Sequence, residues 1–450
     1  MIFSSPVFLF AFLPVVFLLY RVSRNNGYRN ALLAVASLIF YAFGQLVYVP
    51  LFLLSVLINY FAGLLLQKKQ SKAVLAAAIV MNVALLCIFK FSSELGFSTI
   101  ALPIGISFFT FQGMSYVIDT YREPETGTKD FGRLFLYVSF FPRLVAGPIV
   151  KYHEIAPQLL ERSCTAEDSA AGIRRFILGF SKKMLISEPL AFVANSIMDS
   201  FSSNGTGDFR LAWLLAISYM LQLYYDFSGY SDMAIGIGRM FGFTFPENFN
   251  FPYGAESIKE FWRKWHISLS SWFKEYVYIP LGGNRKGKFR AFLNRMLVFL
   301  CTGIWHGANL TYVFWGIGHG ALSTLEDYEI IPVKKLRQTG IGRVVLKIYT
   351  LLAVCLLFIV FRSESLPQAF QIIGAMFAGK PSVLNNSLLA MLLTPAFLFV
   401  LVTAILCAGN LPRKIQIRDS LASALSILLL LLSMFAMAKS GSTPFIYAQF

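Results

Sequence analysis

Long apolar stretches, separated by short polar loops, recur along almost the whole chain. Each has about the length needed to cross the hydrocarbon core of a bilayer, roughly 20 residues. The stretches lie near 5–20, 31–49, 50–66, 73–91, 99–118, 176–197, 211–233, 290–305, 310–325, 344–361, 387–408 and 421–438. The pattern predicts an all-α, polytopic integral membrane protein with about 10–12 transmembrane helices.

Two segments depart from this pattern. Residues 134–150 (LFLYVSFFPRLVAGPIV) are apolar but contain two prolines, a glycine and Arg143. Broken backbone at membrane depth is tolerated where it is buried in protein or lines a wet cavity, so we expect a re-entrant segment there.

From Pro246 to Arg295 no clean crossing occurs, and nine basic residues alternate with tryptophan and tyrosine. This mixture predicts amphipathic helices in the cytoplasmic interface, which either rest on anionic lipid or form a mouth for a polyanionic ligand such as coenzyme A.

Composition and charge agree with a membrane protein. Of the 450 residues, 56% are hydrophobic and 14% are charged, whereas soluble domains carry about 25% charged residues. The net charge of +16 lies mainly in short loops, as the positive-inside rule requires of cytoplasmic loops, and this explains it better than nucleic-acid binding does. By the same rule, the distribution of these charges predicts that the N-terminus lies on the non-cytoplasmic side of the membrane. The first charge, Arg21, follows the first apolar stretch, so this stretch is expected to be a retained span rather than a signal peptide.

The chain contains only four histidines, and polar groups at membrane depth are costly enough to suggest a function. His306, in GIWHGAN, lies between two apolar stretches beside a glycine that lets a ligand approach closely. An imidazole has an unperturbed pKa of about 6.5, which suits a general base. The alternative is a histidine that joins helices by hydrogen bonds. His266, in FWRKWHISLS, lies among the basic interface residues, where the alternative is that it faces lipid headgroups.

The other two histidines are weaker candidates. His319 follows His306 by 13 residues, which on an unbroken helix is about 220° around the axis, so the two should not share a face. We expect His319 to be a packing or capping residue. His153 follows the re-entrant segment and is expected to be an interface residue.

Two carboxylates, Asp226 and Asp232, interrupt the apolar stretch 211–233. They must pair with a cation, line water or lie at the cytoplasmic end, and Arg239 is the nearest cation in sequence. On an unbroken helix they lie about 240° apart, so they cannot both face one ligand unless Gly229 breaks the helix, and we expect one of them to be structural.

Several kinds of chemistry have no signal in the sequence. HExxH, paired Cys/His spacings and a carboxylate triad near a histidine are absent, so we expect no metal. GxSxG is absent too, which argues against a covalent serine nucleophile. The five cysteines lie mostly within apolar stretches and argue against a disulfide framework. Of the mechanisms considered for a buried histidine, direct transfer of a group with the help of a general base remains.

Four motifs follow one another along the chain: DFSGYSDMAIGIGRMFGF, PENFNFPY, SIKEFWRKWHISLSSWFKEYVYIPLGGNRKG and TGIWHGANLTYVFWGIGHG. In this order they resemble the membrane-bound O-acyltransferase superfamily, and most closely the bacterial membrane component of alginate O-acetylation and its relatives in peptidoglycan and other polysaccharide acetylation. The resemblance covers nearly the whole chain. It implies a single membrane-embedded acyltransferase domain over residues 1–450, with N-terminal spans (1–133), a re-entrant segment and central spans (134–245), a catalytic core (246–325) and C-terminal spans (326–450).

The resemblance also implies roles for individual residues. His306 corresponds to the catalytic histidine and His266 to a second signature position, which would polarise the carbonyl or gate the opening of a tunnel. The tunnel would bring cytoplasmic acyl-coenzyme A, expected to be acetyl-coenzyme A, to an acceptor on the far side. This thioester is a donor substrate, and no bound cofactor is expected. The expected substrate-binding residues are Trp305, Asn309, Asp226, Arg263, Lys264 and Arg285.

The function implied is O-acetylation of an extracytoplasmic polysaccharide, such as an alginate-like polymer or peptidoglycan, at the bacterial cytoplasmic (inner or plasma) membrane. Besides acyl-coenzyme A and membrane lipid, we expect a periplasmic or extracellular acyltransferase of the serine-hydrolase type as partner, and no nucleic acid. Two alternatives stay open. One is a transporter or flippase with a histidine and aspartate relay, although no internal repeat is visible. The other is an acyltransferase that acts on a lipid or a protein.

Overall fold

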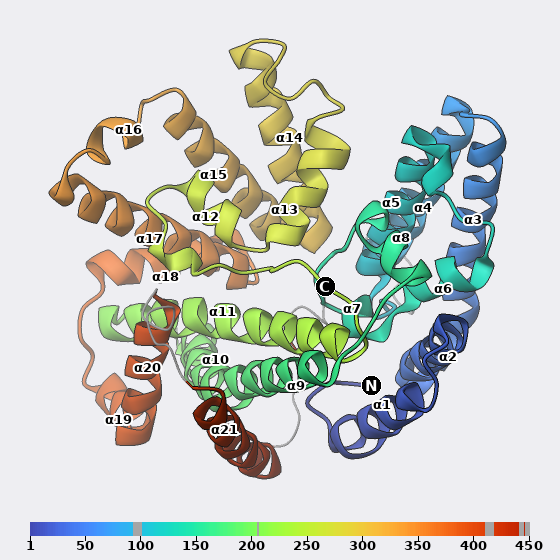
Figure 1. The fold of residues 1–450 in the computed structure, drawn as a ribbon. Coiled ribbons are helices and arrows are strands. Elements are labelled where there is room, and N and C mark those ends of the chain that lie inside the picture. Colours follow the sequence, from blue (N-terminus) through green and yellow to red (C-terminus); the bar gives the residue numbers. More distant parts are fainter. Residues whose placement is uncertain (93–100, 205–206, 410–417, 441–444, 446–450) are drawn as a thin grey trace. The chain divides into compact units, whose positions relative to one another are not determined.

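The computed structural model describes residues 1–92, 101–204, 207–409, 418–440 and 445, and these residues form helices and no strands (Figure 1). The expected all-α fold is confirmed. The chain divides into two compact units, which we call unit 1 (1–180, 230–247 and 437–450) and unit 2 (181–229 and 248–436). The expected division of a single domain into four successive segments stays a prediction.

The elements of unit 1 are a π-helical turn Phe8–Phe12, α1 (Leu13–Val22), α2 (Asn26–Gln45), a 3-10 turn Leu46–Tyr48, α3 (Val49–Lys68), α4 (Lys72–Lys90), α5 (Ile106–Arg122), a 3-10 turn Pro124–Thr126, α6 (Phe131–Ser139), α7 (Phe141–Leu144), α8 (Tyr152–Leu160) and α9 (Ala166–Ser181). The helices of unit 1 up to α5 correspond to the expected apolar stretches, except that the stretch 99–118 begins at residues outside the described part, whereas α8 was not expected and α9 begins ten residues before the stretch 176–197. Helix α11 (Phe209–Met240) belongs to unit 1 from Tyr230 onward and to unit 2 before it.

Unit 2 contains short helices in the region where interfacial helices are expected, and longer ones after it. Its further elements are a π-helical turn Lys182–Ser187, α10 (Glu188–Asn204), a 3-10 turn Pro252–Gly254, α12 (Ile258–Lys264), α13 (Ile267–Phe273), a π-helical turn Lys274–Tyr278, α14 (Lys288–His306), α15 (Leu310–Asp327), α16 (Val333–Leu336), α17 (Gly340–Arg362), α18 (Leu366–Ala378), α19 (Leu384–Leu392), α20 (Pro395–Ala408) and most of α21 (Asp419–Ser440).

Four helical segments of the described residues are long and apolar enough to cross a membrane, and they support a multi-pass membrane protein. They are Asn26–Lys68, which contains both α2 and α3, Lys72–Lys90, Gly340–Arg362 and Asp419–Lys439. A fifth results if Asn385–Leu392 and Pro395–Ala408, which meet at a 69° bend, form one span. The expected total of about 10–12 crossings stays a prediction.

Close packing in unit 1 depends on small and polar residues, as is common where helices meet in a membrane. A Cβ atom at Gly63 of α3 would lie 2.3 Å from the Tyr116 hydroxyl, so glycine at this position makes room for the Tyr116 ring of α5. The buried amides of Asn59 on α3 and Asn82 on α4 donate to each other's side-chain oxygens, at 3.2 and 2.9 Å. These contacts hold α3, α4 and α5 together.

The expected break within residues 134–150 is present, because α6 ends at Ser139, α7 is a single turn and the chain then runs without regular structure to Lys151. Arg143 is fully buried there. Its guanidinium donates to the carbonyl oxygens of Tyr137 and Val150, and it lies 4.6 Å from the centre of the Tyr137 ring. Arg143 therefore satisfies backbone groups that the break leaves without helical partners. Whether the segment is re-entrant in a membrane stays a prediction.

The partner suggested for Asp232 by sequence proximity is wrong. Asp232 pairs with Arg175 of α9, with 2.6 Å between nitrogen and oxygen, and Arg175 also bonds Glu247. Arg239 instead faces Asp168 at 3.3 Å. Arg239 lies seven residues further along the same unbroken helix as Asp232, too far for a direct side-chain pair, whereas residues three or four apart are neighbours.

In unit 2, α14 and α15 pack against each other as a hairpin (Figure 1). A Cβ atom at Gly303 would lie 2.5 Å from the Tyr312 carbonyl oxygen, and one at Gly316 would lie 2.4 Å from that of Phe299. Glycine at both positions therefore lets the two backbones meet. The chain turns at Gly307, which directly follows His306.

Candidate functional site

His306 is the last residue of α14 and is only 3% exposed. Aromatic rings surround its imidazole. The ring centres of Phe361 and Trp315 lie 4.9 and 5.2 Å from it, both edge to face, and that of Tyr312 lies 6.1 Å away. Helices α14, α15 and α17 thus place a titratable group in an apolar, aromatic setting. Such a setting excludes bulk water and strengthens any polar interaction made inside it.

His266 occupies the junction between α12 and α13 in a left-handed backbone conformation, with φ 44° and ψ 54°. A non-glycine residue with positive φ is uncommon, and strain of this kind gathers at functional sites. The side chain is 1% exposed and lies edge-on to Phe227, with 4.6 Å between ring centres. The alternative that His266 faces lipid headgroups is therefore wrong, since the fold buries its ring.

Asn248 fixes the orientation of His266. Its side-chain oxygen lies 3.2 Å from His266 Nδ1, and it accepts from the backbone N–H and the hydroxyl of Ser268 at 3.1 and 2.9 Å. The backbone N–H of Ser268 can only donate, so the Asn248 atom that faces it is the amide oxygen. This oxygen can only accept, so Nδ1 of His266 must carry the proton. Burial lowers the pKa of His266 to about 3, so the ring is neutral at pH 7 and Nε2 is its acceptor nitrogen.

The assignment of tautomer bears on the expected role of His266. A carbonyl is polarised by a hydrogen-bond donor, whereas Nε2 of this tautomer accepts. The geometry therefore disfavours polarisation of a carbonyl and leaves Nε2 able to accept from a hydroxyl group, while the gating role stays a prediction.

Trp305 connects the two histidines. Its ring centre is 4.7 Å from that of His306 and 6.4 Å from that of His266, and it is 4% exposed. Three of the residues expected at the site are thus brought into one buried cluster, although the histidines are 40 positions apart in sequence.

Asn309 and Asp226 make other contacts. The Asn309 side chain begins α15 by accepting from Thr311 N–H, and it donates to the Glu364 carbonyl oxygen at 2.7 Å. Asp226 is 1% exposed and pairs with Lys183 at 2.6 Å. These contacts give both residues structural roles, and their contact with substrate stays a prediction.

The basic residues expected to dock phosphates are not equivalent. Lys264 pairs with Glu260 at 2.8 Å, which compensates its charge, while Arg263 and Arg285 are exposed. A pocket of about 340 Å³ lies in the same region. Lys259, Lys288 and Arg295 line it with Asp327. Lys259 and Arg295 both pair with Asp327, so three cations in the wall share one carboxylate.

The relation expected between His306 and His319 is wrong. They do not lie on one helix, because the chain turns at Gly307 and α15 starts at Leu310. As a result both imidazoles contact the same indole, with the Trp315 ring centre 5.2 Å from His306 and 5.1 Å from His319.

His153 lies in unit 1, where its Nδ1 is 3.0 Å from Asp119.

Asn248 was not among the residues expected at the site, although it lies in the quoted PENFNFPY motif. Replacing it by leucine should lower the unfolding free energy by about 1–3 kcal/mol for each buried donor left without an acceptor. Asn248→Asp keeps an oxygen acceptor for these donors but buries a carboxylate, so it should recover only part of this loss. Thermal unfolding in one detergent compares the two variants, and equal midpoints would contradict this account of Asn248.

The helices of the described residues, the several apolar spans among them and the buried pair of imidazoles beside a tryptophan define a multi-pass membrane protein with a buried polar site. Comparison with known proteins identifies its family. A model of the membrane-bound O-acyltransferase family matches residues 41–366. The chain belongs to this family and is an acyltransferase.

Named relatives support this assignment. A protein of Pseudomonas syringae pv. tomato named probable alginate O-acetylase AlgI is 41% identical over 399 residues, covering 84% of this chain and 75% of that protein. A peptidoglycan O-acetyltransferase of Helicobacter pylori is 37% identical over 424 residues, covering 84% and 80%. A teichoic acid D-alanyltransferase of Bacillus subtilis is 29% identical over 246 residues, covering 50% and 59%.

Proposed function

We propose that this protein moves an acetyl group from a cytoplasmic acyl thioester, acetyl-coenzyme A, across the bacterial cytoplasmic membrane for O-acetylation of a cell-envelope polysaccharide. The observation that carries the proposal is the buried His306, adjacent to Trp305 and ringed by aromatic side chains, in a chain of this family. The names of two relatives state that they acetylate alginate and peptidoglycan, respectively. An alginate-like polymer, peptidoglycan or a similar polymer is therefore the acceptor class we propose.

In the proposed reaction His306 is the general base. It removes the proton from an acceptor hydroxyl as the oxygen attacks the thioester carbonyl carbon. The carbon–sulfur bond then breaks, and the leaving thiolate takes the proton back from the imidazolium. A positioned base contributes typically 10²–10⁴-fold to the rate. The aromatic wall of Tyr312, Trp315 and Phe361 would keep water from hydrolysing the thioester.

The donor would dock on the basic surface of unit 2. The 340 Å³ pocket at Lys259, Lys288 and Arg295 has an excess of positive charge suited to the phosphates of coenzyme A. Exposed Arg263 and Arg285 would add to the attraction, whereas Lys264 is already paired with Glu260.

We further propose that a periplasmic or extracellular acyltransferase of the serine-hydrolase type receives the acetyl group and passes it to the polymer. If the purified chain alone acetylates the polymer at the full rate, this part of the proposal is wrong.

The full chain in lipid nanodiscs tests the reaction with acetyl-coenzyme A labelled in the acetyl group. We expect the thioester to be cleaved and the label to appear on a hydroxyl acceptor. A transporter would leave acetyl-coenzyme A intact while moving substrate, and this result would overturn the proposal. Mass spectrometry of the envelope from a deletion strain identifies the acceptor, because O-acetyl esters should disappear from one polymer and not from lipids or proteins.

A further inference from the structure

His319 is a buried histidine that the proposed reaction does not use. It is 0% exposed, and neither of its ring nitrogens has a hydrogen-bond partner among the described residues. The indole N–H groups of Trp262 and Trp315, whose rings both contact the His319 ring, are buried and likewise lack partners among these residues. Buried polar groups are nearly always satisfied, so several unsatisfied nitrogens around one ring indicate a polar guest.

Aromatic rings enclose this position, and we call them the His319 cage. Trp315 and Trp262 stand edge-on at 5.1 and 5.2 Å between ring centres, and Phe261 and Phe299 lie nearly parallel at 6.2 and 6.3 Å. The polar atoms that these side chains present are therefore nitrogens, and the rest of the wall that they form is apolar. Trp315 also contacts His306, so the cage lies one indole ring away from the proposed base.

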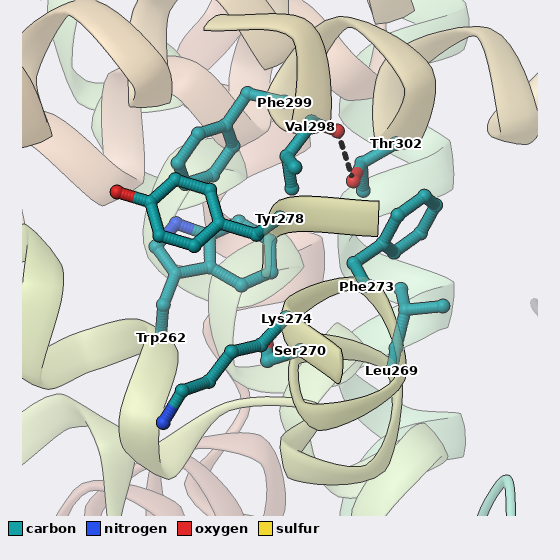
Figure 2. A pocket seen from close by; sticks show the side chains of 9 residues that line it. All are labelled: Trp262, Leu269, Ser270, Phe273, Lys274, Tyr278, Val298, Phe299 and Thr302. Carbon is teal, nitrogen blue, oxygen red and sulfur yellow. Dashed lines mark hydrogen bonds between the residues drawn. The ribbon is translucent and has the colours of Figure 1, made fainter. Parts of the chain in front are cut away.

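A pocket of about 160 Å³ adjoins the cage, because Trp262 and Phe299 line both (Figure 2). Figure 2 shows the rings of Trp262, Tyr278 and Phe299 grouped on one side of the pocket and Leu269 with Phe273 on the other. A water molecule occupies about 30 Å³ of liquid, so the pocket suits a slender chain rather than a nucleotide. Its wall is mainly apolar, and the Thr302 hydroxyl is already bonded to the Val298 carbonyl at 2.8 Å.

The nitrogens of the cage define the chemistry of the guest. The two indoles can only donate, and a neutral imidazole offers one donor and one acceptor. The set is complementary to an amide, which carries a carbonyl to accept and an N–H to donate. An amide also occurs in the slender arm that links the thioester to the nucleotide in coenzyme A.

We propose that His319, Trp262 and Trp315 form a subsite for an amide of the donor's thioester arm, reached through the 160 Å³ pocket. This inference rests on the function proposed above, since it concerns the donor of the same reaction. His319 is then a donor-binding residue. It holds the arm so that the thioester reaches His306.

Two small acetyl donors test the subsite in the full chain in nanodiscs. S-Acetyl-N-acetylcysteamine contains one amide, whereas S-propyl thioacetate contains none. In His319→Leu, kcat/KM for the amide donor should fall by about tenfold, the effect of one lost hydrogen bond, and mainly through KM. With the alkyl donor it should stay within about twofold, because that donor makes no such bond. His319→Gln, which keeps a donor and an acceptor, should recover most of the loss.

Equal losses with both donors would show a packing role only and overturn the subsite, as would no loss with either. Trp262→Phe keeps an aromatic ring, although a smaller one, and removes one N–H, so it repeats the comparison if the leucine variant does not fold.

A binding measurement separates this inference from the proposed function. S-Ethyl-N-acetylcysteamine cannot transfer an acetyl group, and calorimetry should show that it binds the wild type more tightly than His319→Leu. Such binding supports the subsite even if the wild type fails to cleave acetyl-coenzyme A, a failure that would overturn the proposed function alone. Equal binding to the two proteins, or none to either, would overturn the subsite.

Discussion

Replacing His306 by alanine should lower the rate of acetyl transfer by about 10²–10⁴-fold, the contribution of a positioned general base. The fall should appear in kcat, because the imidazole acts on the proton of the acceptor hydroxyl rather than on the binding of the donor. Transfer of labelled acetyl from acetyl-coenzyme A, measured in nanodiscs with saturating donor, gives this rate directly.

Two controls separate loss of the base from loss of structure. His306 is packed among aromatic rings, so His306→Gln, which keeps most of the volume, should lose activity as well while its unfolding midpoint stays closer to that of the wild type. His153→Gln changes a histidine that bonds Asp119 in unit 1, and it should keep the transfer rate within about twofold, as a substitution away from the reacting groups. A folded His306→Ala protein with the wild-type rate would show that the base lies elsewhere.

The helices could be predicted from the sequence because their signal is local. Apolar stretches near 73–91 and 344–361 correspond to α4 (Lys72–Lys90) and α17 (Gly340–Arg362) within a few residues. Pro142 likewise indicated the break between α6 and α7, since proline in a helix interior removes a backbone hydrogen bond and clashes with the preceding turn. Length and apolar character alone, however, do not determine which of the shorter helices cross a membrane.

Pairs of charged residues could not be predicted, because they depend on tertiary contacts. Asp226 was recognised as costly at membrane depth, but Lys183, its partner, lies 43 residues earlier and on another element. Asn248 was missed for the same reason, since its importance comes from the contact with His266, 18 residues later. Sequence proximity favoured Arg239 as a partner, whereas the fold brings Arg175 to Asp232.

The error on His319 has a different cause. The angle between His306 and His319 was derived for an unbroken helix, but Gly307 ends α14 and Asn309 begins α15. The sequence carried the signal, because glycine after the last helical residue and asparagine as an N-terminal cap are frequent at helix boundaries. Once the helix is divided there, the two imidazoles can approach the same tryptophan from different helices.

The buried charges of unit 2 predict a large effect on stability. Lys183 is 3% exposed and lies in the π-helical turn before α10. Its ammonium contacts Asp226 at 2.6 Å and Glu188 at 2.8 Å, so one cation compensates two carboxylates. Removing one partner of a buried ion pair leaves the other charge desolvated without compensation, which costs about 3–5 kcal/mol.

Lys183→Met should therefore lower the unfolding free energy by about 3–5 kcal/mol, measured by denaturant unfolding in one detergent. Lys335→Met is the control, because this lysine is exposed on α16 of the same unit. Its effect should stay below about 1 kcal/mol. Adding Asp226→Asn to Lys183→Met removes one of the uncompensated charges and should restore part of the stability. If Lys183→Met and Lys335→Met unfold alike, water reaches the carboxylates and the ion pair does not stabilise the fold.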